Sequence, residues 1–319
     1  MLPVEFRAYG KINLVLAVGN RREDGFHSVE TVLHRAEVFD VIRISESSEK
    51  GIRIICDCPS VPTDASNLVH RAISEYCRAL GRADGSFGYL VEIEKHIPVS
   101  GGMGGGSADA GCVLRELNIA EGEPLGIEKI AEIAASLGSD VPFFVYGLPA
   151  MLGVGRGERM LPCPKMPECR MELRACGSKP STGAMYAALD AMREEENARN
   201  NEGDSALDGE GRGTENAART DGLDEIPWEN RGICRGVDGV KGYSPRIEKM
   251  LRALEGGSLD EVCGAISNDF EPVFIKNNRE AEPSFEEIRE DMLSRGARAV
   301  FLCGSGPTVC GIFPPDGAV

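Results

Sequence analysis

The sequence predicts a mostly antiparallel β-sheet covered by helices, in a chain long enough to form two domains. Residues 11–18 and the run that starts at Ser28 alternate polar and apolar side chains on either side of a turn at 20–25, which is typical of an antiparallel strand pair. Apolar residues recur at helical spacing over 67–81 and 127–137. The 319 residues exceed what one average domain requires, so two cores are expected.

The next elements are predicted in order along the chain. Strand patterns continue over 38–45, 51–56 and 87–97. The last of these strands leads into a glycine-rich loop at 100–107, and residues 108–118 have the composition of a helix. The order strand, glycine loop, helix is the strongest local signal in the chain.

An acidic segment interrupts the second half. Residues 193–242 contain 13 acids, 7 bases and 9 glycines but few large apolar residues, so we expect a disordered insertion there. The elements predicted beyond it are helices over 245–254, 258–266 and 283–294, a strand over 299–303 and a turn over 304–307.

Composition excludes several classes of partner. Acids outnumber bases 51 to 35, and a net charge of −16 repels the phosphate backbone of nucleic acids. The longest apolar runs are too short to span a bilayer and no signal peptide is recognisable, so no membrane is expected and a cytoplasmic location is predicted. The 11 cysteines are scattered without CxxC spacing, which favours reduced thiols over a metal site.

The loop at 100–107, with sequence SGGMGGGS, carries the clearest chemical signal. Residues without a Cβ let the backbone approach a ligand closely, and the N-terminus of the following helix attracts negative charge. The loop matches neither the GxxxxGK[ST] of P-loop proteins nor the GxGxxG of dinucleotide-binding folds. A phosphate-binding loop is the favoured interpretation, and a tight connection with glycines kept for packing is the alternative.

Three further features carry little weight on their own. Lys11 lies at the start of the first strand and fits a solvated strand end as well as a catalytic cation. Asp140 follows the helix C-cap Gly138, so it fits a turn or capping residue as well as a functional carboxylate. The turn at 304–306 fits a hairpin as well as a second anion contact.

Together and in this order, the motifs resemble those of GHMP-type small-molecule kinases. The similar segments are Lys11-Ile-Asn13, Pro98 to Ala110, Leu137 to Phe143 and Gly304-Ser-Gly306. Three more motifs are similar to those of the GHMP family that phosphorylates 4-diphosphocytidyl-2-C-methyl-D-erythritol: Asp24-Gly-Phe-His27, Ser66-Asn-Leu68 and Asn268-Asp-Phe-Glu271. The resemblance spans nearly the whole chain apart from the acidic segment.

The resemblance implies a fold and an activity. The fold is a two-domain α+β architecture, in which residues 1–162 form an ATP-binding domain like domain 2 of ribosomal protein S5. Residues 163–319 would form a ferredoxin-like domain that contains the insertion. The activity is ATP-dependent phosphorylation of the 2-hydroxyl of 4-diphosphocytidyl-2-C-methyl-D-erythritol in the non-mevalonate (MEP) pathway to isoprenoid precursors. The implied cofactors are ATP and Mg²⁺.

The resemblance also assigns roles to residues. Asp140 would act on the substrate hydroxyl as base or orienting group, with Lys11 beside it. The residues implied in ATP binding are Asn67, Leu68, Pro98, Gly101, Gly102, Met103, Gly104, Gly105, Gly106 and Ser107. Those implied on the substrate side are Asn13, Phe26, His27, Lys95 and Thr182, of which Phe26 would stack on the cytosine while His27 and Lys95 read its edge. Gly304, Ser305 and Gly306 would add a further turn to the site.

The sequence departs from the family pattern at two positions that bear on the site, and two other functions remain as alternatives. Phe26 stands where the family usually has Tyr, which keeps the stacking but removes a hydroxyl. Ala108 stands where the family usually has Ser, so the magnesium ligands are not assigned. The chain could phosphorylate another alcohol, such as homoserine or mevalonate, or bind a nucleotide without catalysis. A small molecule is the expected partner, in a monomer or homodimer.

Overall fold

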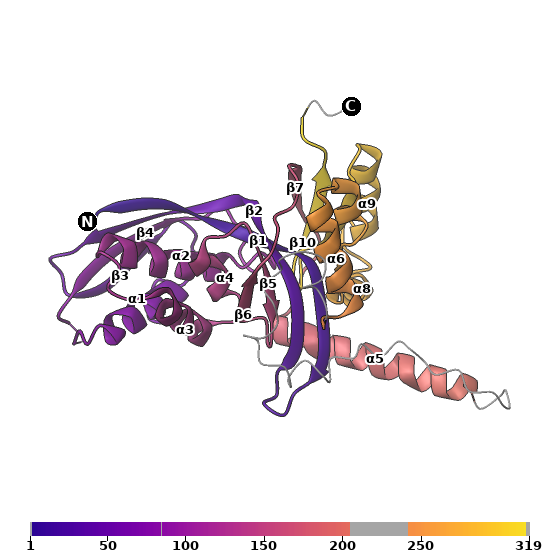
Figure 1. The fold of residues 1–319 in the computed structure, drawn as a ribbon, viewed down its shortest axis with the longest axis horizontal. Helices are drawn as coiled ribbons and strands as arrows, with labels where there is room; N and C mark the ends of the chain where they lie inside the picture. The colour runs from indigo at the N-terminus through magenta and orange to yellow at the C-terminus, as the bar shows by residue number, and fades with distance from the viewer. Residues whose placement is uncertain (1, 84, 205–241, 317–319) are drawn as a thin grey trace.

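The computed structural model describes residues 2–83, 85–204 and 242–316, which form two sheets flanked by helices (Figure 1). The larger sheet contains β1 (Val4–Arg21), β2 (His27–Glu46), β3 (Gly51–Cys56), β4 (Gly88–Glu94), β5 (Ala150–Val154), β6 (Arg159–Pro162) and β8 (Ser267–Asn268). The smaller sheet contains β7 (Arg170–Ala175), β9 (Ala299–Leu302) and β10 (Thr308–Phe313). The helices are α1 (Leu68–Ala79), α2 (Gly105–Ala120), α3 (Ile127–Leu137), α4 (Val141–Tyr146), α5 (Thr182–Asp204), α6 (Pro245–Gly256), α7 (Leu259–Cys263), α8 (Phe270–Asn277) and α9 (Phe285–Ser294).

The hairpin of β1 and β2 is the longest feature of the fold. The two strands pair antiparallel from Val4 and Ile44 at one end to Arg21 and His27 at the other. Register shifts interrupt the pairing at three places, and such bulges bend and twist a strand pair. Figure 1 shows the hairpin curving from the helix-covered part of the sheet toward α5. One hairpin therefore lines much of the cleft described below.

Helices α1 to α4 pack with the larger sheet around the main core. The buried residues of α3, which are Ile130, Ile133, Ala134 and Leu137, recur at the spacing of one helix face. β1 is buried on both of its faces from residue 10 to residue 18, because α2 and α6 both pack against it. This burial fixes the position of polar side chains that point from β1 into the cleft.

The smaller sheet has its own core. β10 is its central strand and pairs antiparallel with both β7 and β9. Phe274 of α8, Met292 of α9 and Leu302 of β9 are fully buried there. β8 belongs to the larger sheet, where it pairs in parallel with Val15 and Leu16 of β1. The border proposed at residues 162 and 163 falls between β6 and β7.

Most of the elements predicted from the sequence are present. The bounds of the helix predicted over 127–137 are the observed bounds of α3, while the strand predicted over 38–45 is the second half of β2. The helix predicted over 258–266 is shorter, because α7 ends at Cys263 and β8 follows. The elements that were not predicted are α4, β5, β6, β7, α5, β8, α8 and β10.

The expected disorder from residue 193 is wrong at its start, because α5 continues to Asp204. The Arg193 guanidinium donates to the Val18 carbonyl oxygen at 2.7 Å and pairs with Asp269 at 3.1 Å. Lys276 of α8 pairs with Glu195 at 3.0 Å. These tertiary contacts hold a helix whose sequence has little amphipathic pattern. The remainder of the predicted insertion, from 205 to 241, lies outside the described residues.

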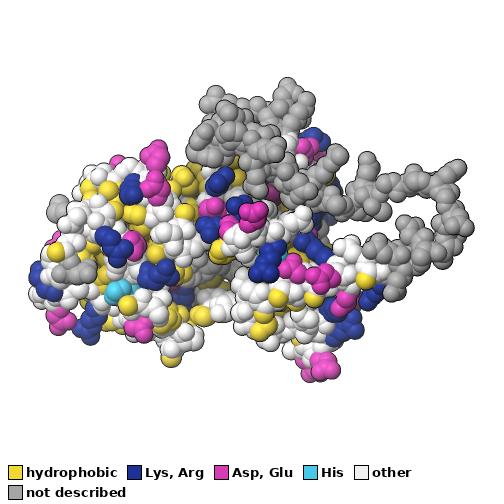
Figure 2. Space-filling view, turned by 90° about the horizontal axis from the view of Figure 1, so that it is seen from below, with side chains coloured by type: hydrophobic (Ala, Val, Ile, Leu, Met, Phe, Trp, Pro, Cys, Tyr) yellow, Lys and Arg dark blue, Asp and Glu magenta, His cyan; other side chains and the backbone are white. Residues whose placement is uncertain are grey.

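The surface carries charges of both signs. On the face drawn in Figure 2, Lys and Arg side chains are interspersed with Asp and Glu side chains over both halves of the molecule. Across the part of the chain that the structure describes, every helix is too short or too polar to cross a lipid bilayer.

Candidate active site

A cleft of about 1040 Å³ brings together nearly all of the predicted site residues. Its walls come from the glycine loop, the middle of β1, the residues before α4, the start of α5 and the turn at 304–306. Met103 and Gly306 are the predicted residues that do not line it. The sequence motifs are therefore neighbours in space, although they span almost the whole chain.

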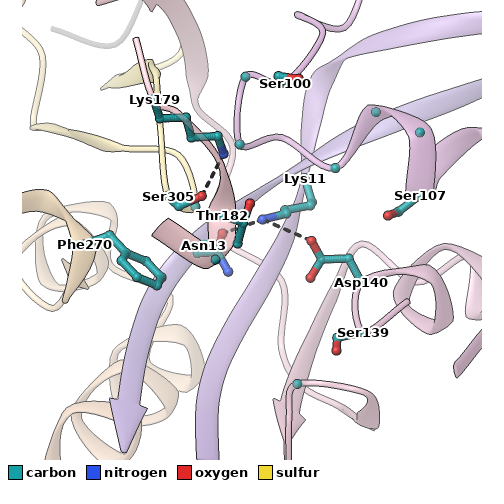
Figure 3. A pocket seen from close by; sticks show the side chains of 18 of the residues that line it. Lys11, Asn13, Ser100, Ser107, Ser139, Asp140, Lys179, Thr182, Phe270 and Ser305 are labelled. Carbon is teal, nitrogen blue, oxygen red and sulfur yellow. Dashed lines mark hydrogen bonds and ion pairs between the residues drawn. The ribbon is translucent and has the colours of Figure 1, made fainter. Parts of the chain in front are cut away.

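Lys11 and Asp140 face each other across this cleft (Figure 3). The Nζ atom of Lys11 lies 3.5 Å from Oδ2 of Asp140 and donates to Oδ1 of Asn13 at 2.8 Å. The Lys11 side chain is 5% exposed and that of Asp140 is 40% exposed. Asn13 in turn donates to the Thr31 hydroxyl at 2.8 Å. Lys11 is therefore a buried, oriented cation and not a solvated strand end.

Asp140 lies between α3 and α4, and its side chain does not cap α4. It follows Gly138, the C-cap of α3, and occupies the N-cap position of α4. Its side chain makes no capping hydrogen bond, although aspartate is a favoured N-cap residue. The carboxylate instead points into the cleft toward Lys11 (Figure 3). The interpretation of Asp140 as a mere capping residue is wrong.

The glycine loop is shaped by the turn that follows β9. Gly102 and Gly104 have φ angles of 81° and 69°, which residues with a side chain rarely adopt. A Cβ on Gly102 would lie 2.1 Å from the carbonyl oxygen of Cys303. The Thr308 amide donates to the Gly101 carbonyl oxygen at 3.2 Å, which ties the loop to the start of β10. The glycines therefore serve close backbone packing as well as any ligand.

The loop ends at the N-terminus of α2, where backbone N–H groups have no partner within the helix. Such a terminus attracts anions through these donors and through the helix dipole. Lys11 passes directly beneath it, since a Cβ on Gly104 would lie 3.3 Å from Cε of Lys11. Peptide N–H groups and one ammonium thus converge on one end of the cleft.

Met103 and Gly306 support the site from behind. The Met103 side chain is fully buried, and its carbonyl oxygen accepts from the Lys11 amide at 2.9 Å. The Gly306 amide donates to the Cys303 carbonyl oxygen at 2.8 Å, and a Cβ there would lie 2.8 Å from the Phe274 ring. Met103 thus holds the backbone of Lys11 in place, and Gly306 holds the second turn in place.

Asn67 and Leu68 border the other side of the loop. Both line the cleft, and Asn67 is the N-cap of α1. The Asn67 Oδ1 atom accepts from the Val69 amide at 2.8 Å, and its Nδ2 atom donates to the Pro62 carbonyl oxygen at 2.6 Å. The side-chain polar atoms of Asn67 thus organise the segment before α1, while Leu68 supplies apolar surface.

Lys95 lies elsewhere than predicted. Its ammonium pairs with Asp40 of β2 and, at 2.7 Å, with Asp109 of α2. A Cβ on Gly105 would lie 3.4 Å from Nζ of Lys95, so the ammonium is beneath the glycine loop. Asp40 lies far from His27 along the strand β2 (His27–Glu46), which rises about 3.3 Å per residue. The structure places Lys95 at the loop end of the cleft and not beside His27, because two buried carboxylates hold it there.

Phe26 and His27 form the opposite end of the cleft together with α5. The His27 Nε2 atom lies 2.9 Å from Asp190 Oδ1, and its ring stacks on Tyr186 with centroids 4.9 Å apart. Phe26 is 52% exposed, and the Arg156 guanidinium lies 4.8 Å from the centre of its ring. This end of the cleft therefore offers aromatic faces and a hydrogen-bonded imidazole.

Among the cleft residues that sequence reasoning missed are three polar side chains in or just before α5: Lys179, Tyr186 and Asp190. Thr182, at the first position of α5, is the one residue of this region that was predicted. The helix escaped prediction because its apolar residues do not follow a clear stripe. Lys179 donates to the Ser305 hydroxyl at 2.7 Å, and burial, with a smaller effect of the Lys11 ammonium, lowers the pKa of Lys179 to about 8.

The chain is similar to known proteins over nearly its whole length. It matches the model of the GHMP kinases N terminal domain over residues 67–148 and that of the GHMP kinases C terminal over residues 250–319. A 4-diphosphocytidyl-2-C-methyl-D-erythritol kinase from Listeria innocua is 31% identical over 308 residues, which cover 97% of this chain and 87% of that protein.

Solved structures agree with this relationship. The crystal structure of a 4-(cytidine 5'-diphospho)-2C-methyl-D-erythritol kinase is 25% identical with a TM-score of 0.65, covering 97% of this chain and 90% of that chain. A homoserine kinase from Cytophaga hutchinsonii, at 15% identity and a TM-score of 0.60, covers 98% of this chain and 86% of its own and shares the fold alone. The predicted two-domain α+β fold of GHMP kinases is confirmed.

Proposed function

The chain belongs to the 4-diphosphocytidyl-2-C-methyl-D-erythritol kinase family of GHMP kinases, and we propose that its cleft transfers the terminal phosphoryl group of ATP to the 2-hydroxyl of that substrate. The prediction of an ATP-dependent small-molecule kinase of the isoprenoid MEP pathway is confirmed by relatives of about 30% identity that match the chain from end to end. The single observation that supports the assignment of roles is the Lys11–Asp140 pair beside the N-terminus of α2.

The glycine-loop end is the proposed ATP site. The peptide N–H groups of Gly105, Gly106 and Ser107 would contact the phosphates, because a helix N-terminus favours negative charge. Leu68 and Pro98 supply apolar surface beside the loop for the adenine, and Asn67 keeps the start of α1 in position. Gly101, Gly102 and Gly104 let the loop backbone come close enough for these contacts.

The hairpin end is the proposed cytosine site. A pyrimidine presents an apolar face and a fixed edge of donors and acceptors, which an aromatic ring and a polar ring can recognise together. Phe26 and Tyr186 supply the faces, and His27 supplies the polar ring, oriented by Asp190. Asn13 and Thr182 lie between this end and the loop, where the methylerythritol part of the substrate would extend.

The chemical step needs alignment, a proton acceptor and stabilisation of charge. The oxygen of the substrate 2-hydroxyl attacks the terminal phosphorus of ATP, and the bond between that phosphorus and the bridging oxygen of ADP breaks. The hydroxyl proton passes to the Asp140 carboxylate, or is held by it as the hydroxyl is oriented. Lys11, fixed by Asn13, offsets negative charge on the transferred group.

Mg²⁺ would accompany the nucleotide. Within residues 2–83, 85–204 and 242–316, no group of three or more His, Cys, Asp or Glu side chains could hold a metal by itself. Kinase Mg²⁺ is bound mainly by phosphates, waters and one or two protein oxygens. Ser107 at the start of α2 and the buried Oδ1 atom of Asp109, which has no hydrogen-bond partner among the described residues, fit that need. When bound, the ion neutralises phosphate charge.

A panel of alcohols tests the proposed function. Purified protein with ATP and Mg²⁺ is offered 4-diphosphocytidyl-2-C-methyl-D-erythritol, homoserine or mevalonate, and ADP release is measured. We expect release with the cytidine substrate alone. Release with homoserine or mevalonate instead would favour a GHMP kinase for another alcohol, which shares the fold. Tight ATP binding without release on any alcohol would favour a nucleotide-binding protein that lacks catalysis.

A further inference from the structure

Lys179 is a second ammonium at the phosphoryl-transfer end of the cleft. It belongs to the segment between β7 and α5, and its Nζ atom donates to the Ser305 hydroxyl at 2.7 Å. Figure 3 shows its side chain extending into the pocket above Lys11 and Thr182, on the side away from Asp140. Ser305 follows Gly304, where a Cβ would lie 3.1 Å from the Nζ atom of Lys11. The same turn thus contacts both lysines.

Lys179 differs from the other lysines of the cleft in its partners. Lys11 faces Asp140 at 3.5 Å, and Lys95 faces Asp109 at 2.7 Å. In the described part of the chain, no carboxylate lies within 4.0 Å of the Lys179 ammonium, which donates to the neutral Ser305 hydroxyl. This end of the cleft therefore has one positive charge in excess, from the two ammonium groups of Lys11 and Lys179 and the single carboxylate of Asp140.

A half-buried ammonium without a carboxylate in contact is costly, because it loses hydration and the more distant Asp140 offsets only part of that loss. This cost lowers the pKa of the group: burial, with a smaller effect of the neighbouring Lys11, lowers the pKa of Lys179 to about 8. An anion that enters the cleft would supply the missing charge and restore the ammonium form. The position beside Lys11 and the 304–306 turn indicates a phosphate group.

We propose that Lys179, positioned by Ser305, binds a phosphate oxygen on the opposite side of the transferred phosphoryl group from the glycine loop. This inference rests on the proposed function, which puts two phosphate sources in the cleft. One is the terminal phosphate of ATP, and the other is the diphosphate of the cytidine substrate. Both present the same anionic oxygens, and binding measurements separate them.

The test compares Lys179→Met, which keeps an apolar stem and removes the charge, with Lys179→Arg. The control is Lys129→Met on the exposed face of α3, where Lys129 pairs with Glu132. Calorimetry with Mg²⁺ measures the affinities of ATP and ADP without acceptor. If the contact is with the terminal phosphate, Lys179→Met weakens ATP binding about tenfold and leaves ADP binding unchanged. If it is with the acceptor diphosphate, the acceptor KM rises about tenfold and ATP binding is unchanged.

Lys179→Arg keeps the charge and should restore most of the affinity, for ATP or for the acceptor, that Lys179→Met loses. Ser305→Ala keeps the lysine but not its hydrogen-bond partner, so it should reduce the same affinity by less than Lys179→Met does. A thermal midpoint equal to that of the wild type shows that a variant is folded, and Lys179→Gln replaces Lys179→Met if the latter unfolds. The inference is overturned if ATP affinity, acceptor KM and kcat all stay within twofold of the wild type. Absence of ADP release by the wild type would remove the proposed function, while the ATP and ADP affinities would still decide whether Lys179 contacts the terminal phosphate.

Discussion

The ammonium of Lys11 lies 3.5 Å from the carboxylate of Asp140, which joins the middle of β1 to the start of α4. The pair lies beneath the N-terminus of α2, so a phosphate bound there would meet the cation and the proton acceptor together. The Asp140 side chain does not cap α4, and the buried Lys11 ammonium is held between Asn13 of β1 and Asp140. Such placement is expected of groups kept for chemistry.

Asp140→Asn should remove turnover and keep nucleotide binding. The amide cannot accept the hydroxyl proton, and loss of a positioned general base typically lowers kcat by about 10² to 10⁴. ATP affinity should stay within twofold, because the phosphate contacts come from α2 and the lysines. The measurement is ADP release at saturating substrates together with calorimetry, with Asp260→Asn on the exposed part of α7 as control. Unchanged turnover would exclude Asp140 from the mechanism.

An element can be predicted from the local sequence when its own residues carry the hydrophobic periodicity and the end signals. α3 was predicted to the residue, because its apolar face repeats at helical spacing and Gly138 ends it. α5 was not predicted, because Arg193 and Glu195 hold it through contacts with β1, α8 and Asp269 that no local pattern contains. Propensity is a weak guide where tertiary contacts decide.

The same limit applies to the site. Lys11 and Asp140 became informative only through their order within a set of motifs, since each alone fits an ordinary structural role. Lys95 was predicted at the cytosine, but the buried carboxylates of Asp40 and Asp109 draw it beneath the loop. Lys179 carried no sequence signal, because its partner Ser305 is far away in the chain. The sequence alone could not predict which side chains pair when they are far apart in the chain.

Gly102→Ala should destabilise the protein and weaken ATP binding. The residue has a φ of 81°, and its new Cβ would lie 2.1 Å from the Cys303 carbonyl oxygen, so the loop and the 304–306 turn must separate. Backbone strain alone costs about 1 to 3 kcal/mol. Gly106→Ala is the matched control in the same loop, since its Cβ would meet only Leu68 at 3.7 Å. The free energies of unfolding of the two variants, measured in urea, should differ by at least the cost of the backbone strain. Equal free energies would contradict the close packing of the loop.

Phe26→Leu should raise the KM for the cytidine substrate, and Phe26→Tyr should not. Phe26 lines the cleft with half of its surface exposed, and an aromatic ring stacked on a base contributes about 0.5 to 1.5 kcal/mol beyond simple burial. Leucine loses that contribution, which corresponds to a KM increase of up to about tenfold. The assay varies the acceptor at saturating ATP, and the KM for ATP serves as internal control. A KM unaffected by Phe26→Leu would place the cytosine elsewhere.

Glu172→Gln should lower stability at neutral pH and have less effect in acid. Glu172 of β7 accepts two hydrogen bonds from Arg295, at 2.7 and 2.8 Å, and one from Arg174 at 3.0 Å. The Arg295 guanidinium is the main cause that lowers the pKa of Glu172 from 4.5 to about 2. Because the folded-state pKa is the lower one, this stabilisation is fully present above about pH 4.5 and disappears as the pH falls through about 2.

The shift sets an upper limit of about 3 kcal/mol at pH 7, and solvent screening at the partly exposed Arg295 reduces the expected effect to about 1 kcal/mol. Urea unfolding of wild type and Glu172→Gln at pH 7 and pH 3 measures the difference, which should shrink by more than half at pH 3. Glu290→Gln on the exposed side of α9 is the control and should show no such change. A difference that is equal at the two pH values would mean that the carboxylate charge of Glu172 does not stabilise the packing of β7 against α9, and that the loss at neutral pH comes from hydrogen bonding alone.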